Sequence, residues 1–202
     1  MRASGIGRSL VFSVAAASVL VSCSVGTQFV RPPADFVRLG ETTRAQIVER
    51  YGKPQDERQI SSNGRQVATV GYFFASQSEA AKVPGTLCVR TLMFTLSDDV
   101  VVGEGFRSSC LSDHTDFDER RVGEIVKGKT RCDEVVAMLG RPAAREIYPS
   151  LEKKGDMGIY YFFEYVAQPG RDKPKEFTKE LLVTCDPEGV VSDTSFAESG
   201  TR

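Results

Sequence analysis

The sequence predicts an α+β protein of two tandem units, in which one or two short helices pack on an antiparallel sheet of three to four strands. Three observations predict this class. The stretch 128–142, GKTRCDEVVAMLGRP, matches the stretch 40–54, GETTRAQIVERYGKP, without a gap. Each copy is followed by aromatic and β-branched runs in the same order. Acidic turn signals then lead into a second apolar run in both copies. One compact unit is therefore used twice.

Each matching stretch has the pattern of a short amphipathic helix. Thr42 and Thr130 can accept a hydrogen bond from a free backbone N–H at the start of the helix. Apolar residues then recur at i, i+3, i+4 and i+7, which places them on one buried stripe. The residues expected on this stripe are Ile47, Val48 and Tyr51 in the first helix, and Cys132, Val135, Val136 and Leu139 in the second.

Glycine and proline mark the ends of both helices. Gly52 and Gly140 can adopt the left-handed conformation that commonly ends a helix. Pro54 and Pro142 follow two residues later and prevent the helix from resuming. Each helix is therefore expected to stop at the same place in its unit.

The runs that follow each helix predict strands joined by hairpins. The stretch 72–74, YFF, recurs at 161–163, and the stretch 92–96, LMFTL, recurs as LLVTC at 181–185. β-Branched and aromatic residues favour strands. The stretch 61–64, SSNG, is a strong turn signal between two such strands. We therefore expect an antiparallel sheet in each unit.

Length and charge exclude several classes of protein. At 202 residues with 41% hydrophobic content, the chain is long enough for a packed core. The formal net charge is −1, and no basic stripe is present that could neutralise phosphates. We therefore expect no nucleic-acid partner.

The N-terminus has the pattern of an export signal. Arg2 and Arg8 precede the twelve-residue apolar run 10–21, which is far shorter than the about 20 residues of a membrane-spanning helix. The stretch 20–23, LVSC, resembles the bacterial lipobox, which implies that Cys23 is acylated and becomes the mature N-terminus. The alternative is an ordinary secretory signal that contains a cysteine.

Acylation would also define the location of the chain. Several acyl chains hold a protein durably on a bilayer. Ser24 stands where an Asp signals inner-membrane retention in many Gram-negative bacteria. The lipobox resemblance therefore implies the outer membrane, with the protein facing the periplasm.

The predicted organisation has five parts. They are a lipoprotein signal peptide at 1–22, a tether at 23–35, unit one at 36–110, a bridge at 111–117 and unit two at 118–202. The tether carries a Pro pair and little periodicity. The residues from Ala197 onward are expected to fray.

The four cysteines other than Cys23 predict two disulfides, among three possible pairings. Cys88 and Cys110 lie at nearly equal distances in sequence from the turn 98–99, so that folding of the hairpin brings them together. A bulge at Gly103 or Gly105 would absorb the one-residue offset.

The second pair follows from helix and strand periodicity. Cys132 is on the apolar stripe of its helix, and Cys185 takes the place of Leu96 on the core face of a strand. We therefore expect one bridge in each unit, Cys88–Cys110 and Cys132–Cys185. A metal site is the alternative, but the sequence has no Cys-x-x-Cys and no histidine near these cysteines.

The sequence contains no recognisable catalytic constellation. His114 is the sole histidine, and no Gly-x-Ser-x-Gly elbow or phosphate-cradling glycine motif is present. His114 with Asp113, Asp116 and Asp118 could hold a cation, but the stretch lacks the glycine and the closing glutamate of a calcium loop. We therefore expect a solvated linker there, and no catalytic residue, metal, cofactor or small-molecule substrate.

The stretch 159–165, IYYFFEY, is aromatic on both faces of its predicted strand. One face must belong to the core, because a sheet of this size buries one side. The other face is either a binding surface or the contact between the two units, since outward aromatic residues usually cover something.

The order of motifs resembles the SmpA/OmlA family of BamE-like outer-membrane lipoproteins. That order is lipobox, Gly-x-Thr, apolar helix, Leu-Gly-x-Pro, aromatic strand and final hairpin. Unit one matches over 37–106, with Tyr51 where the family usually has Leu. Unit two matches over 126–196, through Gly128, Thr130, Val135, Leu139, Gly140, Pro142, Tyr161, Phe163 and Gly189. The resemblance implies two short helices on a three-stranded antiparallel sheet.

The resemblance also implies a function. Family members support the outer-membrane β-barrel assembly machinery through protein–protein contact, and the segment 27–35 lacks the family's usual contact motif. The tandem layout is similar to that of the β-lactamase inhibitory proteins, whose paired sheets grip an enzyme. The leading hypothesis is a non-catalytic lipoprotein that binds envelope proteins, such as the barrel-assembly machinery. The alternative is an inhibitor or binding module for a periplasmic enzyme or cell-wall component.

Overall fold

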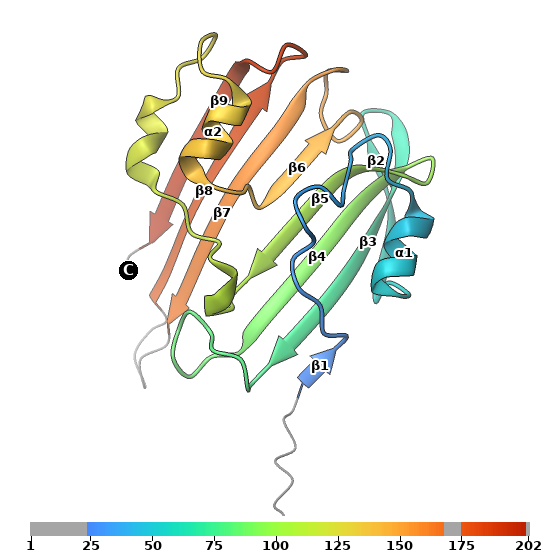
Figure 1. The fold of residues 1–202 in the computed structure, drawn as a ribbon, viewed down its shortest axis with the longest axis vertical. Helices are drawn as coiled ribbons and strands as arrows, with labels where there is room; N and C mark the ends of the chain where they lie inside the picture. The colour runs from blue at the N-terminus through green and yellow to red at the C-terminus, as the bar shows by residue number, and fades with distance from the viewer. Residues whose placement is uncertain (1–23, 168–174, 201–202) are drawn as a thin grey trace, which may run out of the picture.

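A computed structural model describes residues 24–167 and 175–200, and Figure 1 shows its elements. Two α-helices and two short 3₁₀ helices accompany nine strands in these residues. In chain order the elements are β1 (Ser24–Gly26), α1 (Arg44–Tyr51), β2 (Asp56–Ser62), β3 (Arg65–Ser76), β4 (Cys88–Ser97), β5 (Val100–Ser108), η1 (Leu111–Asp113), η2 (Glu119–Glu124), α2 (Cys132–Leu139), β6 (Ala144–Ile147), β7 (Met157–Ala167), β8 (Lys175–Cys185) and β9 (Val191–Gly200).

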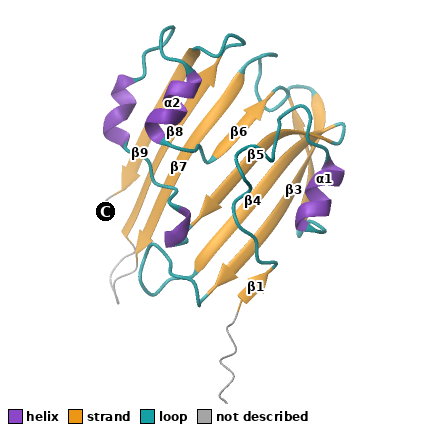
Figure 2. Cartoon of the chain, viewed as in Figure 1, coloured by secondary structure: helices purple, strands orange, loops and turns teal. Residues whose placement is uncertain are grey.

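The predicted α+β class, with a separate sheet and its helices in each unit, is wrong. The described residues are mainly strand, and all nine strands belong to one antiparallel sheet (Figure 2). The strand order is β1-β3-β4-β5-β6-β7-β8-β9, and β2 also pairs with β3. The helices are short additions to this sheet.

The short strand β6 joins the two halves of the sheet. Its residues 144–146 pair with Gly103–Gly105 of β5, and its residues 144–147 pair with residues 157–160 of β7. In the first half, β2 follows α1 as β6 follows α2, but β2 pairs only with β3. The sequence expectation missed this joint because β6 has only four residues and no strand-like alternation.

Both hydrophobic cores lie on the same face of the sheet. The first core contains Ile47 of α1 with Phe94 of β4, and the second contains Val135 of α2 with Ile159 of β7. Phe94 and Ile159 stand in one register row, through residues 104 and 145, and therefore project to the same side. Figures 1 and 2 show both helices in front of the sheet. We call the opposite side, on which none of the described helices lies, the open face.

Thr42 and Thr130 form hydrogen bonds in the turn before each helix, and not at the start of the helix as expected. The Thr42 hydroxyl accepts from the backbone N–H of Arg38, and the Thr130 hydroxyl accepts from that of Val126, both at 2.8 Å. They therefore close the turn that precedes each helix and do not cap the helix itself. Thr43 is the residue that caps α1, with its hydroxyl accepting from the Gln46 N–H.

The helices end at the residues that the sequence predicts, and their ends repeat in both halves. Gly52 and Gly140 have φ of 78° and 82° with ψ of −164° and −166°, a conformation that essentially only glycine adopts and that differs from the expected left-handed helical one. The hydroxyl of Tyr72 donates to the Gly52 carbonyl, and that of Tyr161 donates to the Gly140 carbonyl, at 2.9 Å in each case. The same contacts in both halves indicate that they are built on one plan.

The predicted helix stripes are only partly buried. Ile47, Val135 and Leu139 are buried, but Val48 and Val136 are exposed. Helices of eight residues that cover a broad sheet contact it along a narrow line, so a residue adjacent to that line faces solvent.

The segment expected to be a tether is packed against the fold from Ser24 onward. β1 pairs with the end of β3, and Phe29 is buried in the first core. Arg31 donates to the Pro142 carbonyl, and Arg141 donates to the Pro32 carbonyl. The segment therefore connects the two halves on the helix-bearing face.

The β2–β3 turn confirms the sequence expectation, whereas the end of β9 differs from it. Asn63 and Gly64, both with positive φ, form the β2–β3 turn that the sequence predicts. The expected fraying from Ala197 is wrong, because β9 pairs with β8 as far as Gly200. The backbone pairing orders this segment although its side chains are exposed.

Candidate functional site

The predicted lipidation site, Cys23, lies outside the described residues. The next residue, Ser24, is already the first residue of β1 and pairs with Ser76 of β3.

The two predicted disulfides are both present. Cys88 and Cys110, with Cα atoms 4.4 Å apart, join the start of β4 to the residue following the end of the β4–β5 hairpin. Cys132 and Cys185, with Cα atoms 6.2 Å apart, join α2 to β8. A bulge between β4 and β5 lies next to Gly103, as expected. Glu79 lies close to Cys88 and Cys110, but cysteines in a disulfide are not free to bind a metal.

The acidic bridge is partly exposed, and its acids pair with cations of the chain itself. Asp113 accepts from the buried Arg90 at 2.7 Å, whereas Asp116 forms an ion pair with the buried Lys179 at 2.7 Å. Asp118 pairs with Arg120, whose hydrogen bond lowers the Asp118 pKa to about 2. His114 is exposed, with a positive φ of 44°. The carboxylates thus face three different cations.

The sequence reasoning missed the two buried cations. Arg90 and Lys179 occupy equivalent positions in β4 and β8, each two residues before a buried leucine. Arg90 also pairs with Glu79, and Lys179 also pairs with Glu119 and lies over Phe117. A charged residue at an inward position of an alternating strand is the signal that could have identified them.

The remaining carboxylate pairs are turn residues, as expected. Asp98 and Asp99 both have positive φ in the β4–β5 turn. Asp186 accepts from the Val190 N–H in the β8–β9 turn. Their positions account for these acids without a catalytic role.

The open face carries a continuous row of residues across seven strands. Its members are directly opposite one another from β3 to β9, and the middle of the row is small while the flanks are bulky. The row consists of Gly71, Met93, Gly105, Ala144, Tyr160, Leu182 and Ser195.

The outward aromatic residues of β7 lie on this open face and not between two sheets. Tyr160 and Phe162 stack with ring centroids 6.2 Å apart, and the Arg107 guanidinium lies 4.2 Å from the Phe162 centroid. The Tyr160 hydroxyl donates to Glu180, and burial together with this hydrogen bond raises the Tyr160 pKa to about 12. Phe162 thus contacts Arg107 of the first half, so a contact between the units is present on this face beside its outward surface.

A groove of about 420 Å³ crosses the open face at the joint between the two halves. Met93, 44% exposed, forms one wall, and Tyr160 forms the other. Gly105 and Ala144 form the floor, where a Cβ on Gly105 would be 3.7 Å from that of Ala144. The exposed Phe73 and Leu182 extend the apolar surface beyond both walls. The groove can accept an apolar side chain from another molecule.

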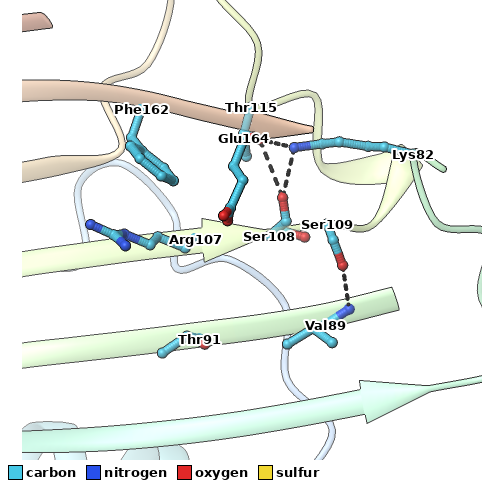
Figure 3. A pocket seen from close by; sticks show the side chains of 9 residues that line it. All are labelled: Lys82, Val89, Thr91, Arg107, Ser108, Ser109, Thr115, Phe162 and Glu164. Atoms are coloured by element: carbon cyan, nitrogen blue, oxygen red, sulfur yellow. Dashed lines mark hydrogen bonds between the residues drawn. The ribbon is translucent and has the colours of Figure 1, made fainter. Parts of the chain in front are cut away.

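A smaller polar pocket lies beside the groove, between the ends of β5 and β7 (Figure 3). The Lys82 ammonium donates to the Ser108 carbonyl at 2.6 Å and to the Thr115 hydroxyl, and burial lowers its pKa. Glu164 contributes a carboxylate to the same pocket. Because Lys82 is satisfied internally, we assign no ligand to this pocket.

The comparisons with known proteins identify no family for this chain. No family model and no curated protein matches the chain. A crystal structure of a candidate β-lactamase inhibitor protein from Streptococcus mutans is similar at a TM-score of 0.46 and 12% identity, covering 77% of this chain and 82% of that one. None of the helices in the described residues has the length and apolar character that a membrane span requires.

Proposed function

We propose that this chain is a non-catalytic outer-membrane lipoprotein that faces the periplasm, is anchored through Cys23, and binds a protein partner through the open face. The observation that carries the proposal is the groove between Met93 and Tyr160, with exposed Phe73 and Leu182 beside it. Apolar surface of this kind, rimmed by charged residues such as Arg107 and Glu180, is typical of protein-binding sites.

The choice of partner rests on the sequence resemblance. The motif order shared with the BamE-like lipoproteins makes the β-barrel assembly machinery the first partner to test. The lipobox resemblance at 20–23 supports the same compartment for this chain.

The second candidate is an inhibitor or binding module for a periplasmic enzyme or cell-wall component. The groove favours it, since a floor of Gly105 and Ala144 between two bulky walls accepts one protruding side chain of a loop. The two candidates use the same surface and differ in the partner bound.

Capture from detergent-solubilised envelopes tests the proposal. The tagged chain is expressed near its native level as wild type and as a variant with Met93→Glu and Leu182→Glu. We expect the wild type to retain barrel-assembly components and the open-face variant to lose them, because buried unpaired carboxylates oppose docking.

The control is a variant with Val48→Glu and Val136→Glu, two valines of similar exposure on the helix-bearing side. It should retain the partner. Recovery of no barrel-assembly component by the wild type would contradict the first candidate, and a soluble enzyme lost only from the open-face variant would support the second. Equal capture by all three forms would overturn the open-face proposal.

A further inference from the structure

Three exposed aliphatic side chains lie together at one end of the sheet. Val25 of β1 is 65% exposed, Leu111 is 55% exposed and Leu87 is 45% exposed. Leu87 and Leu111 each adjoin one cysteine of the Cys88–Cys110 disulfide, whose Cα atoms are 4.4 Å apart, so both leucines belong to the same end of the sheet. We call these three side chains the apolar rim.

The rim lies beside the start of the described chain. Ser24 is paired with Ser76, and Ser76 is paired with Cys88, so the three residues occupy neighbouring strands. At the usual strand spacing, Ser24 and Cys88 are about 10 Å apart. In Figure 1 this is the lower end of the sheet, where β1 lies and where β3 and β5 end.

Residue 23 is one peptide unit, about 3.8 Å, from Ser24. Acyl chains on Cys23 would therefore hold this end of the sheet against the headgroups, because the packed segment after Cys23 leaves no free tether. The headgroup region is roughly 6 Å deep on each side of a bilayer, which is comparable with the size of the rim side chains.

The charges near the rim suit such a contact. The carboxylates of Glu79 and Asp113 both accept from the Arg90 guanidinium, so docking would not strip water from an unpaired acid at either position.

We propose that the apolar rim rests on the bilayer surface with Val25, Leu87 and Leu111 inserted among the headgroups. This inference rests on the acylation in the proposed function. The strands then run away from the membrane, and a strand of ten residues such as β9 reaches about 30 Å into the periplasm. The open face stands to the side of the anchor and stays accessible to a partner.

Tryptophan fluorescence tests the rim, because the chain has no tryptophan of its own. The acylated full-length protein is prepared with Leu87→Trp, with Leu111→Trp, or with Val126→Trp as the control. Val126 is 46% exposed and lies at the opposite end of the sheet, in the turn that pairs with the start of β9. Each form is mixed with phosphatidylcholine vesicles whose lipids are brominated near the top of the acyl chains.

Vesicles should shift the emission of both rim tryptophans to shorter wavelength and quench it, and should leave the Val126→Trp emission unchanged. Vesicle-bound protein with unquenched rim tryptophans, or with equal quenching at Val126→Trp, would overturn the rim proposal. The intact mass of the same samples reports acylation separately. A bare thiol at residue 23 would overturn the anchor in the proposed function, whatever the fluorescence shows.

Discussion

At the scale of single residues, two buried cations explain how the bridge holds the halves of the protein. Arg90 and Lys179 take equivalent places in β4 and β8, and acids of the segment 113–119 reach both. Burial of a charge without a partner lowers the stability of the fold. Each buried cation therefore favours the conformation of the bridge in which an acid pairs with it. The bridge is thereby ordered although its composition is that of a loop.

Replacement of Lys179 by methionine tests this role. Lys179→Met keeps most of the side-chain volume but leaves Asp116 and Glu119 without this cation. We expect a loss of about 2 kcal/mol in the free energy of unfolding, measured by urea titration, because the Phe117 carbonyl loses its charged donor while the partly exposed Asp116 and Glu119 can be hydrated. The matched control is Lys127→Met, whose exposed pair with Asp193 should matter little. Equal effects of the two substitutions would contradict the account.

At the scale of elements, the sequence predicts what is local to each unit. The helix ends at Gly52 and Gly140, the turn at Asn63 and both disulfides were predictable, because turn chemistry and periodicity act over a few residues. The strand pairing of β6 with β5 was not predictable. This pairing joins an edge strand of the first half to an edge strand of the second. The four residues of β6 carry no sequence pattern that specifies a pairing partner.

The candidate site likewise has one part that the sequence predicts and one part that it does not. An outward aromatic face of β7 was predicted from alternation, without the assignment of residues 160 and 162 to it. The groove between Met93 and Tyr160 was not, because its floor consists of Gly105 and Ala144, which come from different halves of the chain. Small residues give no sequence signal for a groove until the register across strands is known.

The two disulfides should stabilise the protein to different degrees. Cys132–Cys185 closes a loop of sequence separation 53, and Cys88–Cys110 closes one of 22. Loop-closure entropy predicts that replacing the first pair by alanines costs about 4 kcal/mol, and the second about 3 kcal/mol. Urea titrations of the two double variants measure both values. A larger loss for the Cys88–Cys110 variant would show that loop length does not set the order.

At the scale of the whole molecule, one sheet separates two roles. The helix-bearing face holds both cores and the segment that follows β1, and it stabilises the fold. The open face carries none of the helices of residues 24–167 and 175–200, and it carries the groove with Met93 on its wall. Under the proposed acylation of Cys23, the end of the sheet beside Ser24 would face the membrane. A partner could therefore bind beside the membrane without disturbing the core.

In-cell photo-crosslinking measures the central claim, partner binding at the open face, most directly. A benzophenone amino acid is placed at Met93 in one strain and at Val48 on α1, which is similarly exposed, in another. The account predicts a discrete adduct with one envelope protein from position 93 and none from position 48. An adduct from position 48 with none from position 93 would contradict it.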